Sequence, residues 1–350
     1  MYYVDHTRPP WVDIALPPAI ILSAPTLITL YAAVLGLDYS LLSNERYLQK
    51  YISATQLRIG MALMHIILPM IFISNHPPCN ILFAAGPWFI ASYAAHMPTD
   101  TLTFKKCVYD LFKVTIQDDK DTDKAKIRYK GVAKVSLGIF KLIWMRIFIN
   151  PLLPVHPDDA LEYAWLHPMS LIYTILFGIK AYCLLGAVDI FMGLEQTLFA
   201  WNMVDLFDSP ILATSPRDFW SKRWNKVVRN LLHTQVFTSG TQTKKGIAKK
   251  SSSLYWSSRS IRGLLSFIIS GLFHELIIMS ACRRITLENF AFFTLQGVAV
   301  MIEVTLRQGA LKEERQGKKK YKWIALQLLF MAITGRLFTA PFLRYNFFDE

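Results

Sequence analysis

One apolar stretch constrains the fold of this chain more than any other, because it carries ionisable residues inside a run long enough to cross a membrane. Residues 261–282 read IRGLLSFIISGLFHELIIMSAC, and roughly 20 apolar residues at about 1.5 Å rise span the hydrocarbon of a bilayer. His274 lies about 18 Å along this helix from Arg262, near the middle of the membrane. The residues that share its helix face, at intervals of four, are Arg262, Ser266 and Ser270. Such a face must point into a bundle, and an ionisable group there marks a candidate functional site.

The composition of the whole chain is that of a membrane protein. Of its 350 residues 53% are hydrophobic and 18% are charged, against about 25% charged in soluble domains. The apolar residues form long runs, so we predict an all-α polytopic membrane protein with a single domain over residues 1–350 and a motif-bearing core over about 202–306. The eight expected membrane-spanning helices cover residues 14–37, 55–75, 79–97, 137–153, 168–200, 262–282, 288–306 and 322–343.

Two of these runs are irregular. Lys141 and Arg146 interrupt the fourth, which makes it the weakest of the eight. The fifth, at 168–200, is too long for one upright crossing, so we expect a tilt or a break near Gly186 or Gly193.

The charges between the apolar runs predict the topology. The net charge is +13, and 27 of the 38 lysines and arginines lie in residues 98–136, 202–262 and 307–322. Basic loops face the cytosol, which explains the charge without nucleic acid. Loop 154–167 has three acidic residues and no lysine or arginine, so we place it on the opposite side. This alternation puts both termini in the lumen and fits a multi-pass protein of the endoplasmic reticulum.

A second informative stretch, residues 215–237, reads SPRDFWSKRWNKVVRNLLHTQVF. Ser215 followed by proline and an acid predicts a helix start. On a helical wheel the tryptophans and aliphatic residues fall on one side and the basic residues on the other, so we expect an amphipathic helix on the cytosolic face. Its basic residues are Lys222, Arg223, Lys226 and Arg229, and Asn225 lies at the border of the two faces. The alternative is a helix that only rests on the membrane surface.

Together the two stretches contain what acyl transfer from a thioester to an alcohol requires. A histidine removes the hydroxyl proton as the oxygen attacks the carbonyl, and an amide donor stabilises the negative charge that develops. His274 and Asn225 are the candidates for these roles. The four basic residues of 215–237 are candidates to bind the phosphates of an acyl-CoA. Trp224 is a further candidate for substrate binding, and Ser266 and Ser270 are candidates to line the cavity.

DFWSKRWN at 218–225, followed some 45 residues later by SGLFHE at 270–275, resembles the membrane-bound O-acyltransferase superfamily, and most closely its wax synthase branch. The resemblance implies that His274 is the catalytic histidine and Asn225 the polar active-site residue. It implies acyl-CoA as co-substrate, with no bound cofactor or metal, and the bilayer and the substrates as the partners. It favours a long-chain alcohol as acceptor, giving a wax ester. Acyl or acetyl transfer to a terpenoid, a sterol or a diacylglycerol is the alternative.

Other function classes fit the sequence less well. A transporter would explain many helices and interior polar residues, but not the DFWSKRWN stretch. Clustered metal ligands and a GxSxG motif are both absent from the sequence, which disfavours a metalloenzyme and a serine hydrolase. We expect a structural role for Glu275. The interior ionisable residues whose roles the sequence leaves open are Asp189, Glu195, Glu303 and Arg336.

Overall fold

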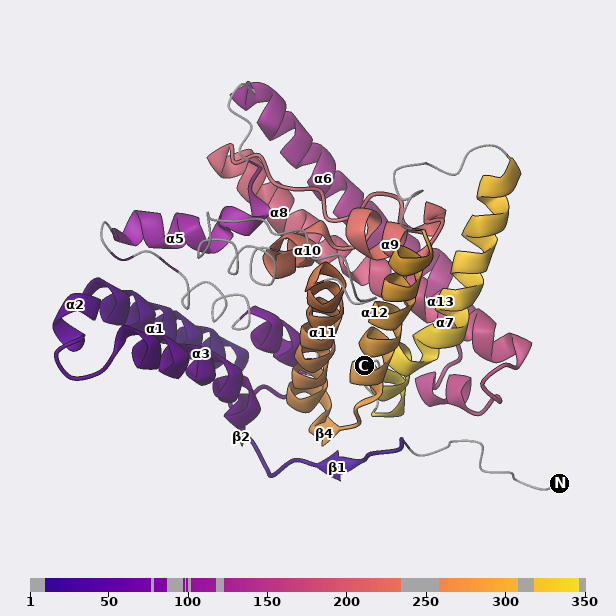
Figure 1. Ribbon diagram of the computed structural model, residues 1–350, viewed down its shortest axis with the longest axis horizontal. Coiled ribbons are helices and arrows are strands. Elements are labelled where there is room, and N and C mark those ends of the chain that lie inside the picture. Colours follow the sequence, from indigo (N-terminus) through magenta and orange to yellow (C-terminus); the bar gives the residue numbers. More distant parts are fainter. Residues whose placement is uncertain are drawn as a thin grey trace. The chain divides into compact units, whose positions relative to one another are not determined.

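The computed structural model of the chain describes residues 10–76, 79–86, 97, 99, 102–117, 123–233, 258–307 and 318–345. Helices dominate these residues (Figure 1). The described chain forms two compact units, one made of segments 115–271 and 288–345 and the other of 10–114 and 272–287. Helix α11, Ser258–Cys282, contributes residues to both units.

The smaller unit is built on two long helices, α1 (Ala24–Ser43) and α3 (Ala54–Ile71). Their buried faces repeat at intervals of three or four residues, with Leu27, Tyr31, Val34, Asp38 and Leu42 on α1 and Leu57, Met61, His65 and Pro69 on α3. Shorter elements complete the unit. They are α2 (Glu45–Leu48), α5 (Phe104–Phe112), and the strands β1 (Ile14–Ala15), β2 (Ile20–Ile21), β3 (Phe72–Ile73) and β4 (Arg284–Ile285).

The first predicted span, residues 14–37, is wrong at both ends. Residues 14–21 are extended, because β1 pairs antiparallel with β4 and β2 pairs parallel with β3. Pro17 and Pro18 lie between these strands, and proline lacks the N–H that a helix interior requires. The helix begins only after Ser23, whose side chain accepts a hydrogen bond from the Thr26 amide, and it continues to Ser43.

A carboxylate and a guanidinium hold the turn between α1 and α3. Arg58 donates from Nε and Nη2 to the two carboxylate oxygens of Glu45, at 3.0 and 2.9 Å, and the glutamate is 2% exposed. The hydrogen bond from Arg58 lowers the pKa of Glu45. Since the charged form is the one that pairs, this contribution to stability is lost as the pH falls through that lowered pKa.

The larger unit is made of longer helices joined by irregular segments. The long helices are α6 (Lys124–Trp144), α7 (Pro168–Leu184), α8 (Gly186–Phe199), α12 (Glu288–Leu306) and α13 (Lys318–Arg344). A π-helical turn, Met145–Ile149, extends α6, and short 3-10 turns follow at Asn150–Leu152 and Pro157–Leu161. A third 3-10 turn, Pro210–Leu212, precedes the short helices α9 (Pro216–Asp218) and α10 (Lys226–His233). The predicted break of the fifth apolar run is confirmed, because α7 ends at Leu184 and α8 begins at Gly186.

Six helical stretches of the described chain are long and apolar enough to cross a membrane. They are Ala24–Ser43, Ala54–Ile71, Pro168–Phe199, Ile261–Cys282, Glu288–Leu306 and Lys320–Arg344. This supports a multi-pass membrane protein, whereas the count of eight stays a prediction. Of the two further predicted spans, 79–97 lies outside the described residues over 87–96. The other, 137–153, falls on the end of α6 and the turns that follow.

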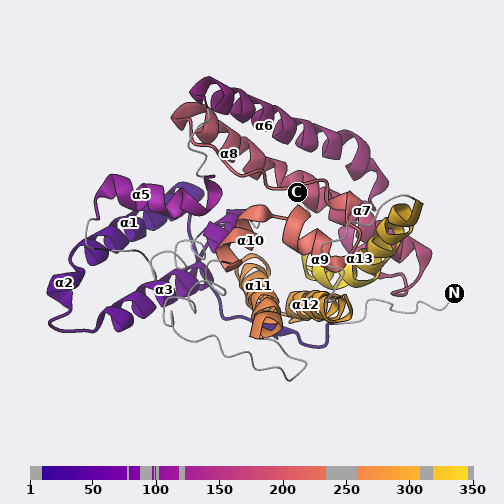
Figure 2. The ribbon, with the colours of Figure 1, turned by 45° about the horizontal axis from the view of Figure 1, so that its top comes forward.

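Helices α6 and α8 lie side by side (Figures 1 and 2) and approach closely at paired glycines. A Cβ atom added at Gly186 would lie 2.8 Å from the Gly138 carbonyl oxygen. One added at Gly193 would lie 2.8 Å from the Gly131 carbonyl oxygen and from the Val135 amide nitrogen. Small residues let helix backbones meet in this way inside a membrane, where van der Waals packing holds helices together.

We therefore predict that Gly193→Ala destabilises the protein, because the new methyl group forces two backbones apart. Overpacking of this kind costs about 1–3 kcal/mol. The matched control is Gly178→Ala on α7, where an added Cβ meets no atom within 4 Å. Thermal unfolding in detergent should show a lower Tm for the α8 variant only. Equal Tm values for the two variants would contradict the close packing of α6 and α8.

Candidate active site

The histidine that the sequence singled out lies on α11, a continuous helix over Ser258–Cys282. His274 is half-buried, and its ring meets the Phe273 ring edge-on at 5.3 Å. Ser270, one turn earlier, is buried, and the Ser266 hydroxyl donates to the Arg262 carbonyl within the helix. The predicted polar residues therefore do lie at helical intervals on one helix.

Glu275 is turned to a different partner. It is 4% exposed, and its Oε2 accepts a hydrogen bond from the Leu287 amide at 3.2 Å. Leu287 lies after β4 in the left-handed region, with φ 58°. A backbone N–H needs a hydrogen-bond acceptor, and the Glu275 carboxylate supplies one for Leu287. This contact fits the structural role expected for Glu275.

The prediction of one amphipathic helix over 215–237 is wrong, although its start is right. The Ser215 side chain accepts from the Asp218 amide, and Pro216 is the first residue of α9. The chain then makes a π-helical turn over Phe219–Arg223, extends at Trp224 (ψ 131°), and restarts as α10. Residues 234–237 lie outside the described residues. The helical wheel failed here because Trp224 and Asn225 leave the helical conformation.

Asn225 is the residue that makes this break possible. Its φ is 37°, a left-handed conformation that asparagine tolerates better than most residues. Its Oδ1 accepts from the Val228 amide at 3.1 Å, and its carbonyl accepts from the Arg229 amide at 3.1 Å. Asn225 thus caps α10. Because Oδ1 makes the cap, Nδ2 is turned the other way, and it makes no hydrogen bond among the described residues.

The backbone on both sides of Asn225 is fixed by one neighbouring segment, residues 203–208. The Asp208 amide donates to the Arg223 carbonyl, and the Lys226 amide donates to the Leu206 carbonyl, both at 2.9 Å. These two hydrogen bonds fix the backbone on both sides of the turn at 224–225. A rigid turn of this kind can present a side-chain N–H donor without reorganisation.

The four basic residues of the stretch do not form one helical face. Arg223 is used inside the turn, where it donates to Asp218 at 2.9 Å and to the Asp208 carbonyl at 3.1 Å. Arg229 donates to the Ser221 carbonyl at 2.9 Å. Lys226 lies 4.0 Å from the Asp208 carboxylate, and Lys222 is exposed.

Aromatic rings join this turn to the rest of the larger unit. Trp224 stacks on Phe219 at 5.2 Å and meets Phe207 at 4.9 Å. The Trp220 indole donates to Gln296 on α12 at 3.0 Å, and Gln296 donates on to Thr334 on α13 at 2.9 Å. Gln296 is fully buried, so the motif tryptophan is tied to two long helices through one interior amide.

Most of the interior ionisable residues left open by the sequence have structural partners. Asp189 pairs with Lys141 at 2.6 Å, and Glu303 pairs with Arg307 at 3.0 Å. Arg336 donates to the carbonyls of Leu161 and Tyr163 and to the Ser170 hydroxyl. Glu195 differs, since its Oε2 is buried without a hydrogen-bond partner among the described residues.

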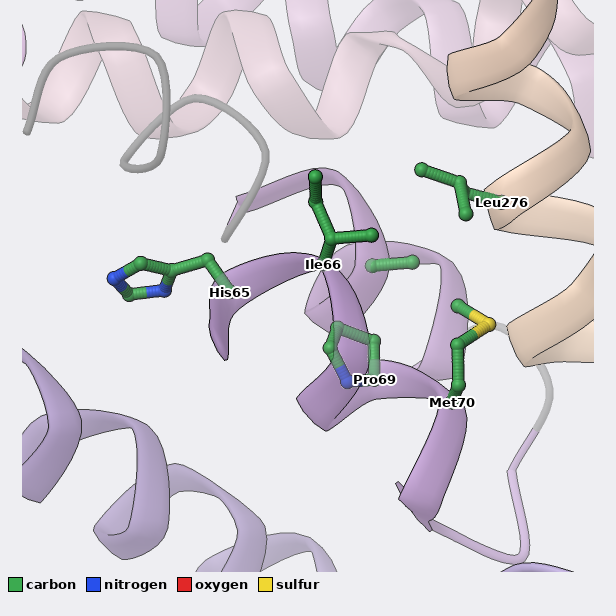
Figure 3. Close-up of a pocket in the computed structure, with 6 residues that line it drawn as sticks. His65, Ile66, Pro69, Met70 and Leu276 are labelled. Atoms are coloured by element: carbon green, nitrogen blue, oxygen red, sulfur yellow. The ribbon is translucent and has the colours of Figure 1, made fainter. Parts of the chain in front are cut away.

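The smaller unit contains a buried pair that sequence reasoning missed. His65 Nε2 lies 2.5 Å from Asp38 Oδ2, with the histidine 1% and the aspartate 4% exposed. Figure 3 shows the His65 ring turned away from Leu276, whose side chain lines a small pocket with residues of α3. The pair joins α1 to α3. The available signal was Asp38, directly after the first predicted apolar run, and His65 inside the second.

Comparison with known proteins gives a family match over part of the chain. Residues 201–295 match the family described as membrane bound O-acyl transferase. This segment, less than half of the chain, is similar to that family. It contains Asn225 and all four basic residues of the turn, and it also contains His274.

Three proteins that are similar to this chain come from plants. A probable long-chain-alcohol O-fatty-acyltransferase 1 of Arabidopsis thaliana is 31% identical over 180 residues, which cover 50% of each chain. A long-chain-alcohol O-fatty-acyltransferase of Simmondsia chinensis is 30% identical over 156 residues, or 41% of this chain and 42% of the relative. An acyl-CoA–sterol O-acyltransferase 1 of Arabidopsis thaliana is 28% identical over 186 residues, or 49% and 51%. The chain therefore spans about half the length of the relatives it matches.

We predict that the protein tolerates Asn225→Gly better than Asn225→Ala. Both variants lose the side-chain cap, but only alanine also strains a backbone at φ 37°, at roughly 1–2 kcal/mol for the left-handed region. Thermal unfolding in detergent should rank the wild type first, the glycine variant second and the alanine variant last. An alanine variant as stable as the glycine variant would contradict the left-handed turn.

Proposed function

We propose that the chain is an acyl-CoA-dependent O-acyltransferase that esterifies a hydrophobic alcohol, with a long-chain alcohol as the preferred acceptor. The observation that carries the proposal is the acyltransferase match over residues 201–295, which includes both Asn225 and His274. The long-chain-alcohol O-fatty-acyltransferases among the relatives support the choice of acceptor.

The proposed reaction needs one base and one hydrogen-bond donor. The imidazole of His274 takes the hydroxyl proton while the alcohol oxygen forms a bond to the thioester carbonyl carbon. The carbonyl oxygen gains negative charge, and Asn225 Nδ2 donates a hydrogen bond to it. When the carbon–sulfur bond breaks, the CoA thiolate leaves with the electron pair and takes the proton from the imidazolium. The products are an ester and free CoA.

The roles assigned to the other residues follow from the partners and the exposure of each side chain. Lys222 is exposed and has the compact charge suited to a phosphate, so we assign it to the acyl-CoA phosphates together with Lys226. Arg223 and Arg229 act mainly through the backbone carbonyls they hold. Trp224 contacts substrate beside the turn, and Ser266 and Ser270 line the cavity along α11.

A sterol is the second candidate acceptor. An acyl-CoA–sterol O-acyltransferase is 28% identical over 186 residues, which is close to the identity of the long-chain-alcohol enzymes. The chemistry at His274 and Asn225 is the same for both acceptors, since each presents one hydroxyl on an apolar body. Incubation of membranes that contain the protein with labelled acyl-CoA and a panel of alcohols separates the two by the ester that forms.

We also propose that the membrane domain has the eight predicted spans and resides in the endoplasmic reticulum. The exposed surface of α6 supports the fourth span, because it carries large apolar side chains while its lysines at 134 and 141 are buried. The exposed large apolar residues over 132–148 are Val132, Leu137, Ile139, Phe140, Ile143, Trp144, Ile147 and Phe148, and Arg146 is exposed among them. A helix with this pattern suits lipid on one side and a polar bundle interior on the other.

Substitution of the two central residues tests the mechanism. His274→Ala should abolish ester formation, because no other base replaces the imidazole. Asn225→Asp keeps the cap and the left-handed turn but removes the N–H donor, so kcat should fall by about 10² or more. Ester formation from labelled acyl-CoA is measured beside protein abundance in the membrane. Near-normal turnover in either variant, at normal abundance, would refute that residue's role.

Exposed charge at the acyl-CoA site gives a separate prediction. Lys222→Gln should raise the KM for acyl-CoA and leave the KM for the alcohol unchanged. The effect should be larger at low salt, where exposed charges are screened less. Lys130→Gln, an exposed lysine on α6, is the control. A change in the alcohol KM instead would remove Lys222 from the acyl-CoA site.

A further inference from the structure

Two lysines on one face of α6 are buried in the larger unit, and the proposed reaction uses neither of them. Lys134 is 7% exposed and Lys141 is 5% exposed. They are seven residues apart and follow the same buried stripe as Gly131 and Gly138. Burying an ammonium group carries a large desolvation penalty unless it is paired and hydrogen-bonded. The groups that pair with the two lysines therefore indicate the role of each lysine.

Lys134 satisfies an irregular piece of backbone. Its Nζ donates to the Met203 carbonyl at 3.0 Å and the Val204 carbonyl at 3.1 Å. It also lies 3.1 Å from the carboxylate of Asp205, whose side chain is 76% exposed. Residues 203–208 are not helical, so their carbonyl groups need donors from elsewhere. The buried Lys134 ammonium donates to two of these carbonyl groups.

Lys141 fixes the aromatic end of the same segment. Its Nζ lies 2.6 Å from Asp189 on α8, and it lies over the rings of Tyr182, at 4.2 Å, and Phe207, at 4.9 Å. Phe207 in turn meets Trp224 at 4.9 Å. The cation is desolvated, which strengthens its attraction to the ring faces. Lys141 is thus linked through Phe207 to Trp224, the residue before Asn225.

The 203–208 segment then fixes the turn itself. The Leu206 carbonyl accepts from the Lys226 amide, and the Asp208 amide donates to the Arg223 carbonyl. Asn225 lies between these two bonds. A displacement of residues 203–208 would move both anchors of the turn at once, and with them the amide of Asn225.

We propose that Lys134 and Lys141 are positioning residues that set the orientation of Asn225 through the 203–208 segment. The inference rests on the proposed acyl transfer, in which Asn225 Nδ2 meets the substrate carbonyl. A shift of the order of 1 Å at such a donor can reduce the rate about 10²-fold. An apolar residue at 134 would fill the space but would leave the Met203 and Val204 carbonyls without their donor.

Two variants test this while leaving no buried charge unpaired. Lys134→Met removes the carbonyl donor, and its partner Asp205 stays in solvent. The double variant Lys141→Met with Asp189→Leu replaces the buried pair by apolar side chains, a change that often preserves stability. Lys130→Met, an exposed position one turn earlier on α6, is the matched control. Each protein is purified in detergent and compared for Tm, kcat and KM.

The expected result is a fall in kcat of about tenfold or more for both variants, with the KM for acyl-CoA within about twofold and the control unchanged. A second readout does not depend on turnover. Protein labelled with 5-fluorotryptophan is examined by ¹⁹F NMR, with the Trp224 signal assigned by Trp224→Phe. The signal should shift or broaden in both variants and stay in place in the control.

An unchanged kcat together with an unchanged Trp224 signal, in the well-folded double variant, would overturn the positioning role of Lys141. The same pair of results for Lys134→Met would overturn that of Lys134. If the wild type forms no ester with any alcohol, the proposed function fails. The Trp224 signal then still reports whether the lysines hold the turn, so the two failures are distinguishable.

Discussion

Inside a membrane the backbone must satisfy its own hydrogen bonds, and the rest of this structure depends on that constraint. A helix meets it locally, which is why six described stretches of this chain are long apolar helices. A non-helical segment next to those helices cannot meet it alone. In the larger unit the non-helical residues 203–208 obtain donors from Lys134 on α6 and from the amide of Lys226.

The same constraint explains the charges in the interior. Three interior ionisable pairs of the described residues each join two elements, with Asp38–His65 linking α1 to α3, Lys141–Asp189 linking α6 to α8, and Glu288–Arg344 linking α12 to α13. A buried pair is costly, and breaking one by removing a single partner is strongly destabilising. Most of the interior charge therefore serves architecture, and its presence in an apolar run is weak evidence for catalysis by itself.

Asn225 stands apart from those pairs. Its oxygen is used by the cap of α10, but its N–H donors make no hydrogen bond among the described residues. The turn around it is fixed by two backbone bonds, a stack of aromatic rings and the guanidinium of Arg223. These restraints fix the position of the turn, as the role proposed for the Asn225 Nδ2 donor requires.

The sequence by itself determined the class of protein, the helix that carries His274, the cap at Ser215 and the irregularity of the run at 168–200. These are local properties, since hydrophobic run length, a capping hydroxyl and a glycine act on their own neighbourhood. Only the tertiary structure decided that residues 14–15 and 20–21 are extended strands, because they pair with residues 284–285 and 72–73. It likewise decided that the stretch at 215–237 breaks at Asn225, because the bonds to residues 206 and 208 come from outside the stretch. The partner of Lys141 lies 48 residues away on α8, and the sequence pattern of α6 does not predict it.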